Sequence, residues 1–116
     1  MSIEELMTIS KTLKGVTTDI KWEEQLCFNV GEKIFLLTAP DQVPPTASFK
    51  VSEEDFDLLT ERKGVKQARY FAKRQWVTVD DISLLSASEW EYYIGASYKL
   101  VASKLTKKLR TELGID

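Results

Sequence analysis

From residue 19 onward, apolar side chains recur at every second position, which is the period of a β-strand that buries one face. The alternating residues form three short runs: Ile20 and Trp22, then Leu26, Phe28 and Val30, then Ile34 and Leu36. Gly31 and Glu32 separate the last two runs, and such a Gly-containing pair is typical of a tight hairpin turn. The sequence therefore predicts adjacent antiparallel strands. Phe35 and Leu37 add apolar groups to the other face, so we expect the second arm to be covered on both sides.

Three helices are predicted around these strands. Ser2 with Glu5, and Ser86 with Glu89, have the spacing of a capping box, and apolar residues follow each pair at spacings of three and four. Ser52 is the expected N-cap of a middle helix. The predicted helices cover residues 2–14, residues 52 to either 59 or 62, and residues 86–105, and the last of them is the longest.

The remaining segments complete an α+β pattern. Residues 47–51 and 75–80 alternate like strands, the prolines between residues 40 and 45 mark a loop, and residues 65–73 read as irregular or partly helical. Antiparallel hairpins with an N-terminal, a middle and a long C-terminal helix predict a two-layer α+β domain rather than a doubly wound parallel sheet. With 116 residues, 43% of them apolar, we expect residues 1–116 to form one domain.

Composition argues against several classes of function. The chain has no histidine and only one cysteine, Cys27, so the usual zinc sites and histidine-activated nucleophiles are not available. No P-loop or dinucleotide fingerprint is present, and we expect neither an enzyme nor a cofactor. There is no apolar run of about 18 residues and no basic leader before an apolar block. We therefore expect a cytoplasmic protein that does not enter a membrane.

Residues 64–79 combine basic and aromatic side chains and contain no acidic residue. The basic members are Lys66, Arg69, Lys73 and Arg74, and such groups suit a phosphate backbone. The aromatic members are Tyr70, Phe71 and Trp76, which could stack on bases or belong to the core. Large aromatics beside a strand are core residues more often than stacking platforms, so we predict that these three, together with Trp22 and Trp90, are packed inside.

Charge is unevenly divided along the chain. Residues 1–61 carry 5 basic and 12 acidic side chains, whereas residues 62–116 carry 11 basic and 6 acidic ones. The fold either keeps these groups apart and creates one face that attracts phosphates, or it interleaves the two halves. The net charge of −2 lacks the strongly basic balance that is usual for a nucleic-acid binder.

A series of short motifs resembles the MmcQ/YjbR family of small bacterial proteins. The motif residues are Gly15-Val16 with Trp22; Phe28-Asn29-Val30-Gly31 with Lys33 and Phe35; Pro45 with Ser48 and Lys50; Tyr70; Ala72-Lys73 with Trp76-Val77; Ser97-Tyr98 with Leu100-Val101; and the stretch from Lys104 to Arg110. They occur in the family's order and span nearly the whole chain.

The resemblance implies a compact α+β fold of the secretion-chaperone-like or frataxin-like kind, in which hairpins form a "double wing" for binding DNA. Where relatives often have proline, histidine and proline, this chain has Arg69, Gln75 and Thr106. The first change adds positive charge and the second removes an imidazole. The third removes a helix breaker, so we expect the last two helical segments to run together.

The leading hypothesis is weak, largely sequence-independent binding of double-stranded DNA. Phosphates would be contacted by Lys66, Arg69, Lys73 and Arg74, helped by Lys33 at the hairpin tip and by Lys50. The alternative is a protein-interaction module or homodimer without nucleic-acid binding, which would use an exposed sheet face or the long C-terminal helix. Tyr92 and Tyr98 lie off the main apolar stripe of that helix, and they are either contacts for such a partner or, as is more common, scattered surface aromatics.

Overall fold

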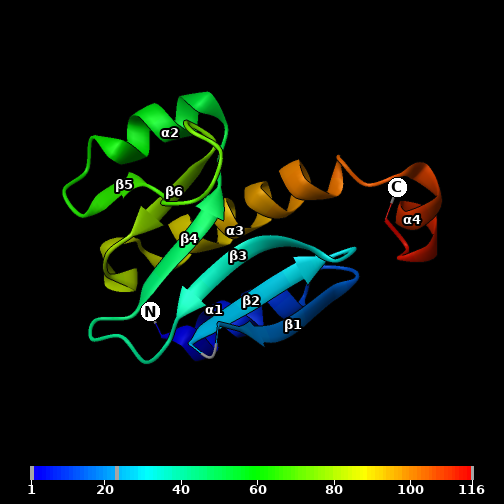
Figure 1. Cartoon of the computed structure of the whole chain (residues 1–116), viewed down its shortest axis with the longest axis horizontal. Helices are drawn as coiled ribbons and strands as arrows, with labels where there is room; N and C mark the ends of the chain where they lie inside the picture. Colours follow the sequence, from blue (N-terminus) through cyan, green and yellow to red (C-terminus); the bar gives the residue numbers. More distant parts are fainter. Residues whose placement is uncertain (1, 23, 116) are drawn as a thin grey trace.

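The computed structural model describes residues 2–22 and 24–115 and has a single six-stranded antiparallel sheet (Figure 1). Its strands run in the order β1-β2-β3-β4-β6-β5. The elements are α1 (Ile3–Lys11), β1 (Val16–Lys21), β2 (Gln25–Val30), β3 (Lys33–Ala39), β4 (Thr46–Lys50), α2 (Glu53–Thr60), β5 (Val65–Gln67), β6 (Trp76–Val79), a 3-10 turn (Ile82–Leu84), α3 (Ala87–Ala102) and α4 (Lys107–Glu112).

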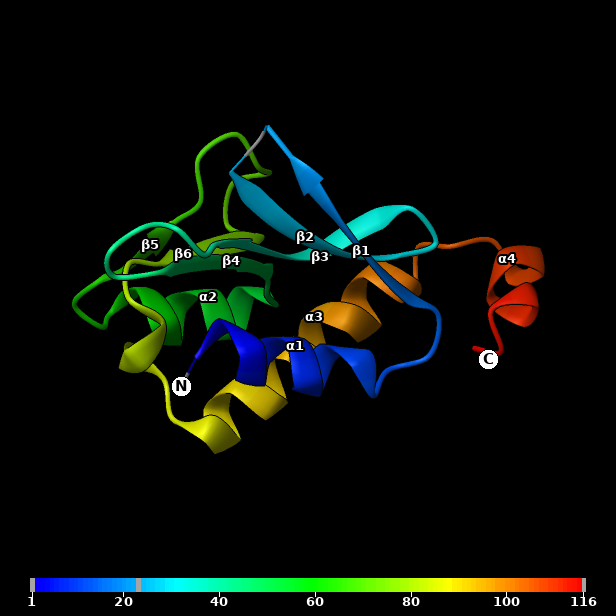
Figure 2. The same cartoon turned by 90° about the horizontal axis from the view of Figure 1, so that it is seen from below.

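Helices α1, α2 and α3 all lie on one face of the sheet (Figure 2). Helix α3 packs on β3 and β4, α2 packs on β5 and β6, and α1 lies against α3 and β1. This arrangement confirms the predicted two-layer α+β architecture. No helix formed by the described residues covers the opposite face, and we call it the open face. No helix within residues 2–22 and 24–115 combines the length and apolar character needed to cross a membrane.

A row of side chains across four strands forms the centre of the core. Phe28, Leu36, Phe49 and Val77 are direct cross-strand neighbours, and all four are fully buried beneath the helices. Trp90 of α3 packs on Phe49 with its ring at 69° and a centroid separation of 5.4 Å. Such edge-to-face packing adds to the stabilisation that burial of the two rings provides.

The predicted hairpin turn between β2 and β3 is confirmed. Gly31 and Glu32 both have positive φ angles, of 56° and 69°, which is the backbone conformation that a two-residue hairpin turn requires. Farther along the pair, a bulge between Phe28 and Asn29 shifts the register and places the extra residue, Phe35, in the core. Leu37 is only half-buried on the open face, so the prediction that this arm is covered on both sides is wrong.

Two elements differ from the prediction. The start of the expected irregular segment forms β5, a three-residue edge strand that pairs with β6. Helix α3 ends at Ala102, and Thr106 begins α4 because its side-chain oxygen accepts a hydrogen bond from the backbone N–H of Leu109. The last two helical segments are therefore separate. Threonine stops the helix here by capping a new one, so a proline is not needed.

Candidate functional site

The middle of the open face is a polar row flanked by an apolar side chain. Leu37, Ser48, Thr78 and Lys66 are successive cross-strand neighbours on β3, β4, β6 and β5. The hydroxyl oxygens of Ser48 and Thr78 are 2.7 Å apart and share a hydrogen bond. Each of these two hydroxyls therefore already has a hydrogen-bond partner. The charged groups of the open face are Lys66 at the end of this row and the side chains around the row.

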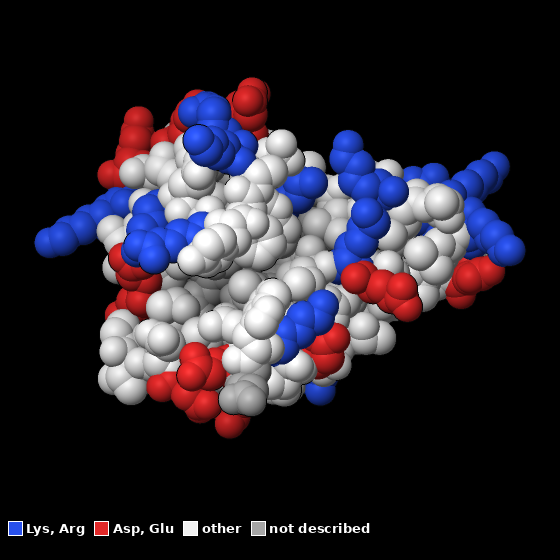
Figure 3. All heavy atoms as spheres, in the orientation of Figure 1, with Lys and Arg blue, Asp and Glu red and all other residues white. Residues whose placement is uncertain are grey.

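A hollow of about 910 Å³ lies over this row, and we call it the aromatic groove. Trp22, directly after β1, contributes one side, and Tyr70 and Phe71 of the loop that joins β5 to β6 contribute the other. Figure 2 shows the end of β1 and this loop rising on the same side of the sheet, opposite the helices. In Figure 3 the hollow is lined largely by uncharged surface, with Lys and Arg side chains at several points along its border.

Trp22 and Tyr70 are exposed, so the prediction that they are core residues is wrong. Their exposed fractions are 69% and 100%, and both have positive φ angles, of 53° and 67°. A bulky residue with a positive φ is uncommon, because its Cβ crowds the backbone. The sequence does show that Trp22 and Tyr70 are large aromatic residues close to strands. It could not reveal that these strands have one face without helices.

Trp76 is buried on the same face, as predicted, because Phe71 covers it. The two rings are nearly parallel, at 20°, with their centroids 4.2 Å apart. Trp76 is 7% exposed, whereas Phe71 is half-buried and lines the groove. The stacked pair therefore anchors the loop of residues 68–75 to the sheet. Trp90, in the core, is also as predicted.

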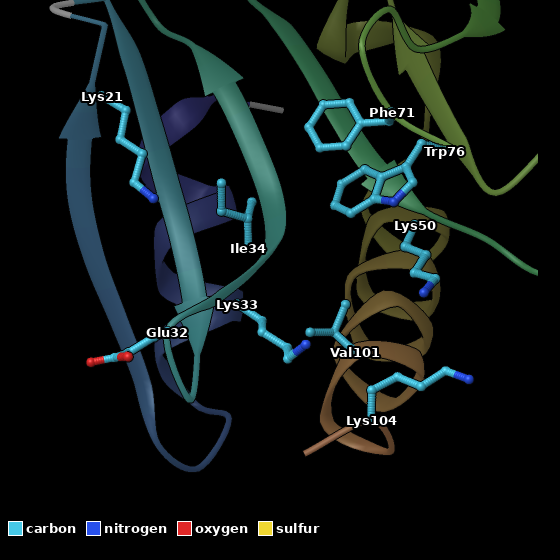
Figure 4. A pocket seen from close by; sticks show the side chains of 9 residues that line it. All are labelled: Lys21, Glu32, Lys33, Ile34, Lys50, Phe71, Trp76, Val101 and Lys104. Atoms are coloured by element: carbon cyan, nitrogen blue, oxygen red, sulfur yellow. The ribbon is translucent and has the colours of Figure 1, made fainter. Parts of the chain in front are cut away.

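A second, shallow hollow of about 380 Å³ adjoins the groove, and we call it the lysine pocket. Ile34 and Phe71 line both hollows, so the two form one continuous surface. Lys33 and Lys50 lie on either side of Val101 at the end of α3, and Lys104 follows on the same segment (Figure 4). Lys21 reaches toward the pocket from β1.

The electrostatics of the lysine pocket favour an anion. Burial lowers the pKa of Lys50, and the nearby charges of Lys104 and Lys33 lower it further. Among the described residues, none of these three lysines forms an ion pair with a carboxylate, although Glu32 contributes to the lining. Like charges held together in this way repel one another, and a bound anion would relieve that repulsion.

Ser97 of α3 fixes the backbone under this pocket. Its fully buried hydroxyl donates a hydrogen bond to the carbonyl oxygen of Phe35 at 2.6 Å. It also accepts one from the backbone N–H of Lys50 at 2.9 Å. One side chain thus ties α3 to both β3 and β4. The position from which the Lys50 side chain leaves the sheet is consequently well defined.

The six residues predicted to contact phosphates fall into groups. Lys33 and Lys50 meet in the lysine pocket, and Arg69 lines the aromatic groove. Lys73 is exposed on the loop of residues 68–75. The first three line the hollows of the open face, and Lys73 belongs to the loop that rises on that side of the sheet (Figure 2). The charges of the two halves of the chain are not kept on separate faces, because Lys33 and Lys50 of the acidic half meet Lys104 of the basic half.

The other two predicted cations are occupied within the protein. Lys66 pairs with Asp80 at 3.2 Å across the β5–β6 edge. Arg74 turns toward α2 and pairs with Asp57 at 2.9 Å and Glu53 at 3.8 Å. These exposed pairs are individually weak, yet they direct both side chains toward carboxylates. Arg74 therefore fastens its loop to α2.

Sequence reasoning missed Lys104 and Lys21 as members of the site. Lys104 belongs to a lysine-rich stretch that also suits the end of a helix, and nothing in the local pattern distinguishes it from Lys107 or Lys108. Only the packing of α3 on β3 and β4 brings it beside Lys50. Within the described part of the chain, no three Cys, Asp or Glu side chains gather as a metal site.

Comparison with known proteins gives matches of family and of fold. The model of the family described as YjbR matches residues 11–100. No curated protein matches the chain. A crystal structure of the Deinococcus radiodurans protein DR2400, with a DUF419 domain, is similar with a TM-score of 0.88 and 27% identity. The match covers 99% of this chain and 89% of that one.

A second crystal structure, of a protein from Pseudomonas syringae, has the same fold. Its TM-score is 0.70 at 20% identity, and the match covers 86% of this chain and 98% of the other. The sheet and helices described above therefore recur in proteins of widely different sequence.

Proposed function

This chain belongs to the YjbR family, and we propose that it is a weak, sequence-independent DNA-binding protein. Phosphates bind in the lysine pocket, through Lys33, Lys50 and Lys104, and along the margin of the loop that carries Arg69 and Lys73. The observation that carries the proposal is the convergence of three lysines from three segments without a carboxylate partner among the described residues.

The chemistry of the surface supports contacts to phosphate rather than to base edges. Lysine offers a compact point charge on a flexible stem and no bidentate pattern that would select one base. Among the described residues that line the aromatic groove, Arg69 is the only arginine. Binding should therefore depend little on sequence. It should depend strongly on salt, with a slope of about −1 in log affinity against log salt for each phosphate contact.

The test is a titration of labelled duplex DNA, followed by fluorescence anisotropy at about 50 and 200 mM salt. The double variant Lys50→Ala/Lys104→Ala should bind more weakly and should reduce the salt slope by about 2, because about one unit is lost with each phosphate contact. The matched control is Lys11→Ala/Lys63→Ala, which removes the same charge from exposed positions on α1 and after α2.

Three results bear on the proposal. The proposal is supported if the wild type binds DNA more tightly at low salt, and if the pocket variant binds more weakly than the wild type while the control variant does not. An equal loss in the control variant would mean that net charge, and not the lysine pocket, governs binding. No affinity at low salt would reject DNA binding altogether.

A second candidate is a protein-interaction module or homodimer that uses the open face. The observation in its favour is that Trp22 and Tyr70 are exposed on a sheet face that no helix covers. An interface on α3 could not use Tyr98, because Tyr98 is buried and its hydroxyl donates a hydrogen bond to the carbonyl of Lys14 at 2.6 Å. Tyr92 remains exposed. Light scattering over a range of concentration distinguishes a dimer from a monomer.

A further inference from the structure

We infer that the ligand of the open face is single-stranded nucleic acid, whose bases stack on the rings of the aromatic groove while its phosphates lie in the lysine pocket. The inference rests on the proposed function and narrows it, since a phosphate-binding surface alone would accept a duplex equally well. Trp22, Tyr70 and Phe71 make the difference.

The aromatic rings occupy places where bases can reach them. Trp22 and Tyr70 line one hollow from segments far apart in the sequence, and both rings are largely exposed. Phe71 is stacked on Trp76 and also lines the hollow. Stacking of a base on an aromatic side chain tolerates any sequence, because every base has a π-face.

The rings and the cations belong to one surface of suitable charge. Ile34 and Phe71 line both the aromatic groove and the lysine pocket, so a nucleic-acid strand that leaves one hollow enters the other. Two carboxylates also line this surface, Glu32 in the pocket and Asp80 in the groove, where Asp80 is paired with Lys66. The three-lysine cluster is not neutralised in this way, so the pocket end of the surface is cationic.

The shape of the groove favours an unpaired strand. In a duplex the bases are stacked on one another inside and the phosphates face outward, so a duplex would meet the lysines but leave Trp22 and Tyr70 without base surface. An unpaired strand can turn its bases into a hollow of about 910 Å³ and keep its backbone on the cationic margin. Both kinds of contact are then made at once.

Trp22 lies in the turn between β1 and β2 and Tyr70 in the loop between β5 and β6, and neither ring is packed in the core of the fold. Both Trp22 and Tyr70 have φ angles in the left-handed region, which costs a non-glycine residue free energy. Neither ring recovers that cost through burial. A ligand that stacks on the rings would recover it in the complex. The backbone geometry thus agrees with the role that exposure and placement give to these two residues.

The experiment compares labelled (dT) strands of about 12 nucleotides with a duplex of the same length at low salt. We expect tighter binding of the single strand, with quenching of the exposed Trp22 indole. Tyr70→Ala and Trp22→Ala should each weaken single-strand binding by about fivefold to one-hundredfold and leave the salt slope unchanged, because stacking does not release counterions. Their effect on duplex binding should be small.

The matched control is Tyr92→Ala, which removes another exposed tyrosine, on α3. Melting temperatures of all three variants check that they fold. Duplex binding as tight as, or tighter than, single-strand binding would overturn the inference and leave the proposed function in place. The same holds if Tyr92→Ala weakens binding as much as Tyr70→Ala. If neither nucleic acid binds, the proposed function and the inference both fail.

Discussion

Gly31 is the residue at which the β2–β3 hairpin meets the C-terminal helical segments. Its φ is 56°, and a Cβ added here would lie 2.8 Å from both terminal methyl groups of Leu105 and 3.0 Å from one of Leu109. Glycine is required on two counts, backbone conformation and space. The turn also begins the strand that carries Lys33, so the same residue helps to position the lysine pocket.

Replacing Gly31 by alanine should lower the free energy of unfolding by at least about 1–2 kcal/mol, the cost of a left-handed backbone for a residue with a Cβ, and the close approach to Leu105 adds to that cost. Urea unfolding monitored by circular dichroism measures the change. Gly95 is the control, because it lies within α3 and an added Cβ would have no neighbour within 4 Å. Gly95→Ala should stabilise the protein by about 0.5–1 kcal/mol. Equal effects at the two positions would contradict this account.

Ser97 carries the second prediction at this scale. Ser97→Ala should cost about 2–3 kcal/mol, because it leaves the carbonyl of Phe35 and the N–H of Lys50 without this partner in the protein interior. The control Ser103→Ala, at an exposed position after α3, should change stability by no more than about 0.5 kcal/mol. Denaturant unfolding of both variants provides the comparison, and a Ser97→Ala change as small as the control would refute the proposed role.

At the scale of elements, the start of α3 is held by a capping box and an ion pair that the sequence pattern only half predicted. Ser86 and Glu89 exchange the reciprocal hydrogen bonds of the box, as their spacing indicates. Glu89 also pairs with Arg62, which follows α2. This contact links the N-terminus of α3 to α2. The ion pair between Arg62 and Glu89 depends on the tertiary structure, so no local sequence motif predicts it.

Glu89 makes the stability of the protein depend on pH. The hydrogen bond from Arg62, with that from the backbone of Ser86, lowers the pKa of Glu89 from 4.5 to about 2. A carboxylate with a lowered pKa in the folded state contributes stability above its ordinary pKa and loses it as pH falls through the folded value. The contribution of Glu89 is therefore fully present above about pH 4.5 and disappears toward pH 2.

Glu89→Gln keeps an oxygen that can accept the capping hydrogen bond from Ser86 and removes the charge that pairs with Arg62, so it should lose up to about 1 kcal/mol at neutral pH and little near pH 2. Urea unfolding across this pH range measures the difference from the wild type. Glu91→Gln, at an exposed position of the same helix, is the control. A difference between Glu89→Gln and wild type that does not change with pH would contradict the assignment.

Most elements of the fold could be predicted because their signals are local. Capping residues, hydrophobic period and the Gly31-Glu32 turn indicate α1, the β2–β3 hairpin, α2 and α3. The edge strand β5 was not predicted because its three residues form a strand only by hydrogen bonding to β6, which lies farther along the chain. The break before α4 was not predicted because Thr106 was interpreted only as the loss of a helix-breaking proline, whereas it is the N-cap of α4.

The site was less predictable than the fold, and for a different reason. Lys33, Lys50, Arg69 and Lys73 were candidates by charge alone, and so were Lys66 and Arg74, which the structure pairs with carboxylates. Whether a cation is paired depends on which elements pack together. Period-two alternation likewise shows that a strand has two faces, without showing which face the helices leave open.

At the scale of the whole molecule, the fold interleaves the acidic and basic halves of the chain. Arg74 of the second half binds Asp57 and Glu53 of the first, while Lys33 and Lys50 of the first half join Lys104 of the second. The result is a local cationic pocket on a protein whose net charge is −2. Long-range steering of a polyanion should be weak, so affinity must come from the contact surface.

The three tryptophans allow one measurement to test whether the open face is the nucleic-acid surface. Trp22 lies in the aromatic groove, Trp76 lies beneath Phe71, and Trp90 is in the core, where its indole N–H donates to the carbonyl of Ile82 at 2.8 Å. A ¹H–¹⁵N correlation spectrum of the labelled protein should contain a separate indole signal for each.

On addition of a single-stranded oligonucleotide at low salt, the account predicts a large shift of the Trp22 indole signal and of the Lys50 backbone amide. The Trp76 signal should shift less because Phe71 covers the ring, and the Trp90 signal should stay in place. Shifts confined to the helical face, around Tyr92, or an unchanged spectrum at low salt, would contradict the claim that the open face binds nucleic acid.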